Sequence, residues 1–105
     1  MLKAGTKIDP RHVAVLSAMG LPKVTVIRKL RIGIFTTGSE LIEPGTTLRP
    51  GQIYDSNKSM LMAALKRPGL ETEDYGRVGD DITAIKAKIE QCAPAVDLII
   101  TTGSA

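Results

Sequence analysis

The sequence contains few aromatic residues and almost no cysteine or histidine. Its 105 residues include one phenylalanine, two tyrosines, one cysteine, one histidine and no tryptophan. The core must therefore be aliphatic, an internal disulfide is excluded, and Cys92 is interpreted as a small core residue rather than a nucleophile. His12 has no second imidazole or thiolate near it in the sequence, so we interpret it as a surface residue. The scarcity of rings also argues against a nucleic-acid platform, which stacks bases on aromatic side chains.

The sequence also lacks a long apolar run, and no apolar segment of the signal-peptide type follows Met1. A membrane-spanning helix needs about 20 predominantly apolar residues, so we expect a cytoplasmic protein that does not contact a membrane. The net charge is +3, and four basic residues lie between residues 23 and 31, where they can steer anions. The length fits one compact domain, and a charged content of 24% is that of a folded chain.

The first 29 residues are predicted to form a helix followed by a strand. Asp9 is suited to cap a helix and Pro10 to occupy its first position, because proline has no N–H to satisfy there. Gly20 is a natural helix stop. Residues 23–29, KVTVIRK, alternate between apolar and polar, which predicts a strand. The side chains expected to turn inward are Val24 and either Val26 or Ile27.

From residue 30 onward, predicted strands and helices alternate. RIGIF, residues 31–35, is an apolar run typical of a strand that is covered on both faces of its sheet. The other predicted elements are helices near 56–67 and 81–93 and strands near 73–78 and 97–102. The helices are expected to present apolar faces made by Met60, Leu61, Ala64 and Leu65 and by Ile82, Ile85, Ile89 and Cys92.

This alternation makes two βαβ units, whose crossovers predict three parallel strands. We therefore expect an α/β fold, a three-layer α/β/α arrangement with a mainly parallel sheet. Residues 1–29 are interpreted as a helix-strand lead-in from a preceding domain, and residues 30–105 as the N-terminal part of the domain that holds the site.

Parallel strands deliver their carboxyl ends to one edge of a sheet, so polar residues that are distant in the sequence should meet there. Gly38 and Gly103 would let backbone N–H groups approach a phosphate closely. The helix start at Ser56 and Asn57 offers further N–H groups, supported by the helix dipole. The residues expected at this edge are Thr37, Gly38, Ser39, Glu40, Asp55, Ser56, Asn57, Asp80, Asp81, Thr101, Thr102 and Gly103.

Glu40 is the most informative acid, because it neither caps a helix nor completes a turn. With Asp80 it could hold Mg²⁺, or orient a hydroxyl or thiol for deprotonation. Asp55, Asp80 and Asp81 each have a simpler interpretation as a helix N-cap. We expect the Glu40 and Asp80 carboxylates to lie within about 12 Å, since metal–oxygen distances of about 2.0–2.6 Å let one phosphate and a metal bridge that span. Spacing alone indicates a nucleotide- or phosphate-binding α/β domain.

Four stretches resemble, in order and spacing, the molybdopterin molybdenumtransferase family. They are TTGSELIEPG (36–45), LRPGQIYDSN (48–57), GRVGDD (76–81) and DLIITTG (97–103). The lead-in AGTKIDPRHVAVLSAMGLPKVTVIRK (4–29) also looks like the segment that precedes the molybdopterin-binding domain of this family. The resemblance covers nearly the whole chain.

The resemblance implies a cytoplasmic enzyme of molybdenum cofactor biosynthesis. Such a transferase binds adenylylated molybdopterin (molybdopterin-AMP) and molybdate and, with Mg²⁺, leaves molybdenum on the dithiolene and releases AMP. Glu40 and Asp80 are then the catalytic acids and the metal ligands. A homodimer is implied for the intact protein, and a molybdopterin adenylyltransferase is a candidate partner. The residues expected to bind the pterin or nucleotide are Thr37, Gly38, Ser39, Asp55, Ser56, Asn57, Thr102 and Gly103.

The sequence departs from the family pattern at its end. The family continues after the third strand with a Gly-Gly-Val-Ser-x-Gly run and a later acid, whereas TTGSA places Ser104 where the second glycine would stand. The chains of the family are also several times longer. We therefore expect a truncated piece that is inactive in molybdenum insertion by itself. We also expect it to self-associate or to be poorly stable, because an edge strand and apolar faces are left uncovered.

Two other functions are compatible with these residues. One is a molybdopterin adenylyltransferase-like domain, which the long loop PGTTLRPGQIYDSN (44–57) disfavours. The other is a non-catalytic scaffold domain of the gephyrin type, in which the same fold presents a groove to a partner protein.

Overall fold

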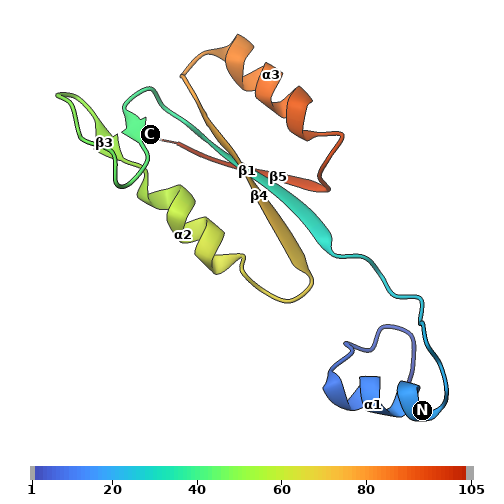
Figure 1. Ribbon diagram of the computed structural model, residues 1–105. Coiled ribbons are helices and arrows are strands. Elements are labelled where there is room, and N and C mark those ends of the chain that lie inside the picture. Colours follow the sequence, from blue (N-terminus) through green and yellow to red (C-terminus); the bar gives the residue numbers. More distant parts are fainter. Residues whose placement is uncertain (1, 104–105) are drawn as a thin grey trace.

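The computed structural model describes residues 2–103 (Figure 1), so the expected departure at Ser104 lies outside the described residues. Three helices and five strands follow one another along this part of the chain. They are α1 (Pro10–Ala18), β1 (Leu30–Thr37), β2 (Leu41–Ile42), β3 (Ile53–Tyr54), α2 (Ser56–Ala64), β4 (Leu70–Val78), α3 (Ile82–Cys92) and β5 (Leu98–Gly103).

The main sheet has three strands in the order β4-β1-β5, and both neighbours of β1 run parallel to it. The register places Ile32 of β1 opposite Thr72 of β4 and Leu98 of β5. A second, two-residue ladder pairs β2 with β3, also in parallel. The predicted parallel topology and the three strands predicted from residue 30 onward are therefore confirmed.

The two helices of the βαβ units cover opposite faces of the main sheet, α2 on one side and α3 on the other (Figure 1). Continuous apolar sequence in β1 makes this possible, and Ile32, Ile34 and Phe35 are buried as a result. Cys92 at the end of α3 is fully buried too, and burial raises the pKa of its thiol. The α/β layering and the core role of Cys92 are as predicted.

Each helix begins at an aspartate whose carboxylate accepts hydrogen bonds from the first turn. Asp55 accepts from the N–H of Lys58 at 3.1 Å, and Asp81 accepts from the N–H of Ala84 at 3.0 Å. Asp9 caps α1 as predicted, and its own N–H donates to Nδ1 of His12 at 3.0 Å. Such caps satisfy backbone donors that have no partner inside the helix.

The lead-in begins with the expected helix and continues as a segment that runs into β1. Within the described chain, residues 23–29 belong to neither of the two sheets. The prediction that their apolar side chains turn inward is wrong, since Val24, Val26 and Ile27 are 50%, 61% and 92% exposed. The lead-in projects away from the sheet (Figure 1), which gives the molecule extents of 63 × 28 × 20 Å.

The predicted apolar faces of α2 and α3 are correct only in part. Met60, Ala64, Ile82 and Ile89 are exposed, whereas Lys58 faces inward and is buried. Ile82 is the first residue of α3, so it lies at the end of the helix rather than over the middle of the sheet. Exposed apolar residues and open strand edges support the expectation of self-association, which stays a prediction.

The carboxylate of Asp97 joins the lead-in to the sheet just before β5. It accepts two hydrogen bonds of 2.6 Å from the guanidinium of Arg28 and one of 2.8 Å from the N–H of Arg31. These donors hold the pKa of the Asp97 carboxyl well below its usual range.

No helix in the described part of the chain is long and apolar enough to span a bilayer.

Candidate functional site

The loops that follow β1 and β4 touch at the carboxyl edge of the sheet. The N–H of Gly38 donates to the carbonyl of Val78 at 3.0 Å, which extends the strand pairing into the loop. A Cβ atom added to Gly79 would lie 3.2 Å from Oγ of Ser39. The residues just before Glu40 and just before Asp80 are therefore neighbours, as the topology predicted.

The end of β5 packs equally closely against the end of β1. Thr37 is paired with Gly103 in the parallel ladder. A Cβ atom on Gly103 would lie 2.9 Å from the carbonyl oxygen of Thr37 and would also collide with its hydroxyl. Only glycine therefore fits at position 103 with this backbone, and Thr102 and Gly103 lie at the same edge as the other predicted residues.

Gly38 is required by its own backbone and by the side chain of Glu40. Its φ angle is +138°, a conformation that residues with a Cβ atom rarely adopt. A Cβ atom there would lie 3.1 and 3.2 Å from the two carboxylate oxygens of Glu40. The half-buried Glu40 carboxylate thus folds back over Gly38, at the end of the central strand.

The β2–β3 ladder brings the start of α2 to this loop. The N–H of Ile53 donates to the carbonyl of Glu40 at 2.8 Å, and the N–H of Asp55 donates to the carbonyl of Ile42 at 2.9 Å. Asp55 is 3% exposed and caps α2, so its simpler interpretation is confirmed. Ser56 and Asn57 form the exposed first turn of the helix, where backbone N–H groups have no intrahelical acceptor.

The two neighbouring aspartates after β4 have different positions. Asp81 is the N-cap of α3, whereas Asp80 precedes the cap and is exposed. Asp80 is therefore not needed to begin the helix. Asp80 follows the end of β4 by two residues, at the carboxyl edge of the sheet, and the expected separation of its carboxylate from that of Glu40 stays a prediction.

The acids at this edge can supply only part of a metal coordination shell. No group of three or more histidine, cysteine, aspartate or glutamate side chains gathers into a metal site among residues 2–103. Mg²⁺ is commonly held by one or two carboxylates together with substrate phosphates and water. Two carboxylates on adjacent loops fit that mode of binding, in which the ligand supplies the remaining oxygens.

Sequence reasoning missed two cations that organise this region. The ammonium of Lys58 forms ion pairs with Glu43 and, at 3.3 Å, with Asp74. Burial lowers the pKa of Lys58, but the hydrogen bond to Glu43 and the charge of Asp74 outweigh this, so the pKa lies above its ordinary value. The second cation is Arg77, whose guanidinium donates to the carbonyls of Gly38 and Ser39. The one sequence signal for Lys58 was its position three residues after the Asp55 cap, on the inner side of the first turn.

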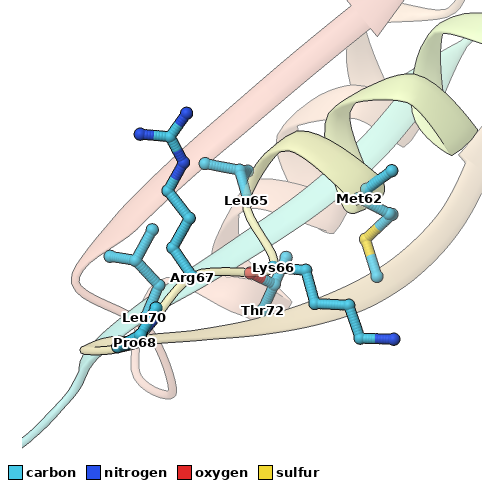
Figure 2. A pocket seen from close by; sticks show the side chains of 8 residues that line it. Met62, Leu65, Lys66, Arg67, Pro68, Leu70 and Thr72 are labelled. Carbon is cyan, nitrogen blue, oxygen red and sulfur yellow. The ribbon is translucent and has the colours of Figure 1, made fainter.

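A cavity of about 350 Å³ lies beside the Glu40 loop and the start of α2. It is lined by Leu41, Ile42, Glu43, Thr46, Asp55 and Arg77. A separate cavity of about 530 Å³ surrounds the end of α2, with the side chains of Leu65, Arg67 and Leu70 (Figure 2). Because Leu70 begins β4, this second cavity lies at the opposite edge of the sheet and takes no part in the site.

The parallel strands, the converging loops and the helix starts define a domain of the α/β class whose polar loops meet at the carboxyl edge of its sheet, the edge at which open α/β sheets bind their ligands. The chain belongs to the family described as "Probable molybdopterin binding domain", whose family model matches residues 33–105. The resemblance stated from the sequence is thereby confirmed.

Curated relatives carry the name of the transferase. Molybdopterin molybdenumtransferase 2 of Mycobacterium tuberculosis is 39% identical over 103 residues, which cover 98% of this chain and 25% of that protein. Molybdopterin molybdenumtransferase of a Nostoc species is 38% identical, over 98% of this chain and 24% of that protein. The chain thus spans about a quarter of the length of the curated relatives that it matches.

Solved structures agree on the fold. The molybdopterin biosynthesis moeA protein of Pyrococcus horikoshii aligns with a TM-score of 0.84 at 38% identity, over 99% of this chain and 27% of that one. A molybdenum cofactor biosynthesis protein of Pyrococcus furiosus aligns with a TM-score of 0.72 at 32% identity, over 95% of this chain and 32% of that one. The α/β fold predicted from the sequence is confirmed by both.

Proposed function

We propose that this domain binds adenylylated molybdopterin and serves in the Mg²⁺-dependent insertion of molybdate into it, with release of AMP. The observation that carries the proposal is the convergence of the loops after β1, β4 and β5 at one edge of the sheet. Membership in the molybdopterin-binding family supports the pterin as ligand. The names of the curated relatives support the transferase reaction.

Glu40 and Asp80 are assigned the catalytic roles and the metal-binding role. Mg²⁺ would neutralise negative charge on the phosphate while the bond between AMP and molybdopterin is broken. The Glu40 carboxylate folds over Gly38 at the end of the central strand, and Asp80 does not cap α3 because Asp81 does so. The position of Glu40 at the end of the central strand and the absence of a capping role for Asp80 support this assignment.

The small and polar residues at the same edge are assigned to the ligand. Glycines permit a close approach of the ligand to the backbone, and the start of α2 supplies N–H groups that favour an anion. The buried Asp55 keeps this start in place through its bond to Lys58. The residues assigned to the pterin or nucleotide are Thr37, Gly38, Ser39, Asp55, Ser56, Asn57, Thr102 and Gly103.

The proposal extends to the intact protein. It is a cytoplasmic enzyme and a homodimer, and it receives its adenylylated substrate from a molybdopterin adenylyltransferase. Residues 1–29 belong to a preceding domain, and residues 30–105 form the N-terminal part of the molybdopterin-binding domain. The projection of the lead-in away from the sheet supports this division (Figure 1).

Substitution of the two acids in the intact protein tests the assignment. Glu40→Gln and Asp80→Asn should each lower the rate of molybdate insertion and AMP release by about 10²–10⁴-fold. Binding of adenylylated molybdopterin should be retained, because the glycines and the start of α2 remain. Glu90→Gln, an exposed acid on α3, is the matched control and should keep full activity.

Three results would contradict the proposal. The first is that the unaltered protein binds no adenylylated molybdopterin, as expected of a scaffold domain. The second is that it transfers AMP from ATP to molybdopterin, as expected of an adenylyltransferase. The third is that both acid variants insert molybdate as fast as the Glu90→Gln control.

A further inference from the structure

We propose that Arg77 is a positioning residue that fixes the conformation of the loop carrying Glu40; this rests on the function proposed for that loop. Arg77 lies near the end of β4, opposite Thr36 of β1. Its Nη1 atom donates to the carbonyl oxygens of Gly38 and Ser39, at 3.1 Å in both cases. One guanidinium therefore bridges the two residues that directly precede Glu40.

The other backbone bonds of this loop hold its ends. At the start, the N–H of Gly38 donates to Val78, which fixes the peptide plane between residues 37 and 38. Beyond the acid, the carbonyl of Glu40 accepts from Ile53, which fixes the plane between residues 40 and 41. The two peptide planes between these anchors hold the carbonyl groups that Arg77 binds.

Those two planes set the position of the acid. A peptide unit is planar and trans, so fixing its carbonyl fixes the whole unit, and the Cα atom of Glu40 belongs to the second one. The carbonyl of Gly38 also accepts a 3.4 Å turn bond from Leu41, which is long for a hydrogen bond. Arg77 therefore donates a hydrogen bond to each of the two planes that lie between the anchored ends of the loop.

Gly38 gives the loop a flexible backbone position, which the hydrogen bonds from Arg77 restrain. Gly38 has φ +138°, and glycine has more backbone freedom to lose on folding than any other residue. Without Arg77, the loop could rotate about this residue and move the Glu40 carboxylate from its place over Gly38. A displacement of about 1 Å of a reacting group can cost about 100-fold in rate.

Arg77 is accessible to mutation without damage to the core. The residue is exposed and lines the cavity of about 350 Å³ beside the loop. Arg67 offers a matched control, because it is also an exposed arginine whose side chain donates to a backbone carbonyl, that of Ala64, at 3.2 Å. Arg67 lies beyond the other end of α2, away from the carboxyl edge of the sheet.

The test uses Arg77→Gln, Arg77→Lys and Arg67→Gln in the intact protein, with two measurements on each. The first is the steady-state rate of molybdate insertion as a function of adenylylated molybdopterin concentration. The second is amide hydrogen exchange over residues 39–41, compared with exchange in α3 and β5. We expect Arg77→Gln to lower kcat by about 10- to 100-fold, with KM changed less than about three-fold.

Exchange over residues 39–41 should become at least about ten-fold faster in Arg77→Gln and stay unchanged in α3 and β5. Arg77→Lys should recover part of both effects, because an ammonium also carries several donors, and Arg67→Gln should show neither. The inference is overturned by unchanged loop exchange, by equal acceleration in α3 and β5, or by a loss confined to KM. If the unaltered protein inserts no molybdate, the proposed function fails, while loop exchange in Arg77→Gln still decides the role of Arg77.

Discussion

The ion cluster of Lys58, Glu43 and Asp74 leads to a prediction about which of its members can be removed. The three side chains differ in their contact with water: that of Lys58 is 4% exposed, that of Glu43 61% and that of Asp74 41%. The cation is therefore buried, while both anions keep part of their hydration. Removing the cation should have different consequences from neutralising the anions.

Lys58→Met should be mildly destabilising. It removes a buried charge, and the two carboxylates that remain are solvated. Pairs with exposed partners are typically worth about 0.2–1 kcal/mol each, so we expect a loss of about 0.5–2 kcal/mol in the free energy of unfolding. The methionine fills a similar volume beneath α2.

The double variant Glu43→Gln with Asp74→Asn should cost more. It leaves a buried ammonium without a counter-charge, which in other proteins costs about 3–5 kcal/mol. The amide oxygens still accept hydrogen bonds, so we expect the lower end of that range, about 3 kcal/mol. Urea unfolding followed by circular dichroism measures both values. A Lys58→Met variant less stable than the double variant would refute the reasoning.

Two further predictions concern close contacts elsewhere in the sheet. Gly33→Ala should destabilise the protein by about 1–3 kcal/mol, because its Cβ atom would lie 2.9 Å from Cε2 of Tyr75. A thermal melt measures the loss, and the additional substitution Tyr75→Leu in the Gly33→Ala chain should restore part of it. Equal Tm values for Gly33→Ala and the unaltered protein would contradict the prediction. The lowered pKa of Asp97 means that its contribution to stability is present above its ordinary value of 3.8 and is lost as the pH falls through its folded value. Asp97→Asn should therefore be less stable than the unaltered protein at pH 7, and the difference between their free energies of unfolding should shrink below about pH 4. Urea unfolding midpoints of both proteins across this pH range measure that difference. A difference that grows on acidification would contradict the prediction.

The topology of the sheet could be predicted from the sequence because a few physical rules determine it. The apolar run at residues 31–35 has to be covered on both faces, and two helical segments of sufficient length lie between the strands. Parallel strands then bring Glu40 and Asp80 to one edge without any knowledge of side-chain packing. The family resemblance added the proposed ligand and the proposed reaction, which spacing alone did not provide.

The features that the sequence did not reveal depend on partners far away along the chain. Residues 23–29 have the alternation of a strand, but a strand also needs a neighbour to pair with, and alternation does not say whether one exists. Lys58 follows a polar motif that gives no sign of its burial, since burial becomes tolerable only once Glu43 and Asp74 lie beside it. Arg77 binds backbone carbonyls, and their direction follows from the loop conformation rather than from residue types.

The central position of β1 makes the loop between β1 and β3 harder to open at its β1 end than at its β3 end. Among the described strands, β1 alone has a neighbour on both sides, whereas β2 and β3 pair over only two residues. Local opening needs least free energy where few backbone bonds and few buried contacts hold a segment. The stretch between β2 and β3 therefore opens more easily than the end of the loop beside β1, although its opening also breaks the ion pair of Glu43 with Lys58.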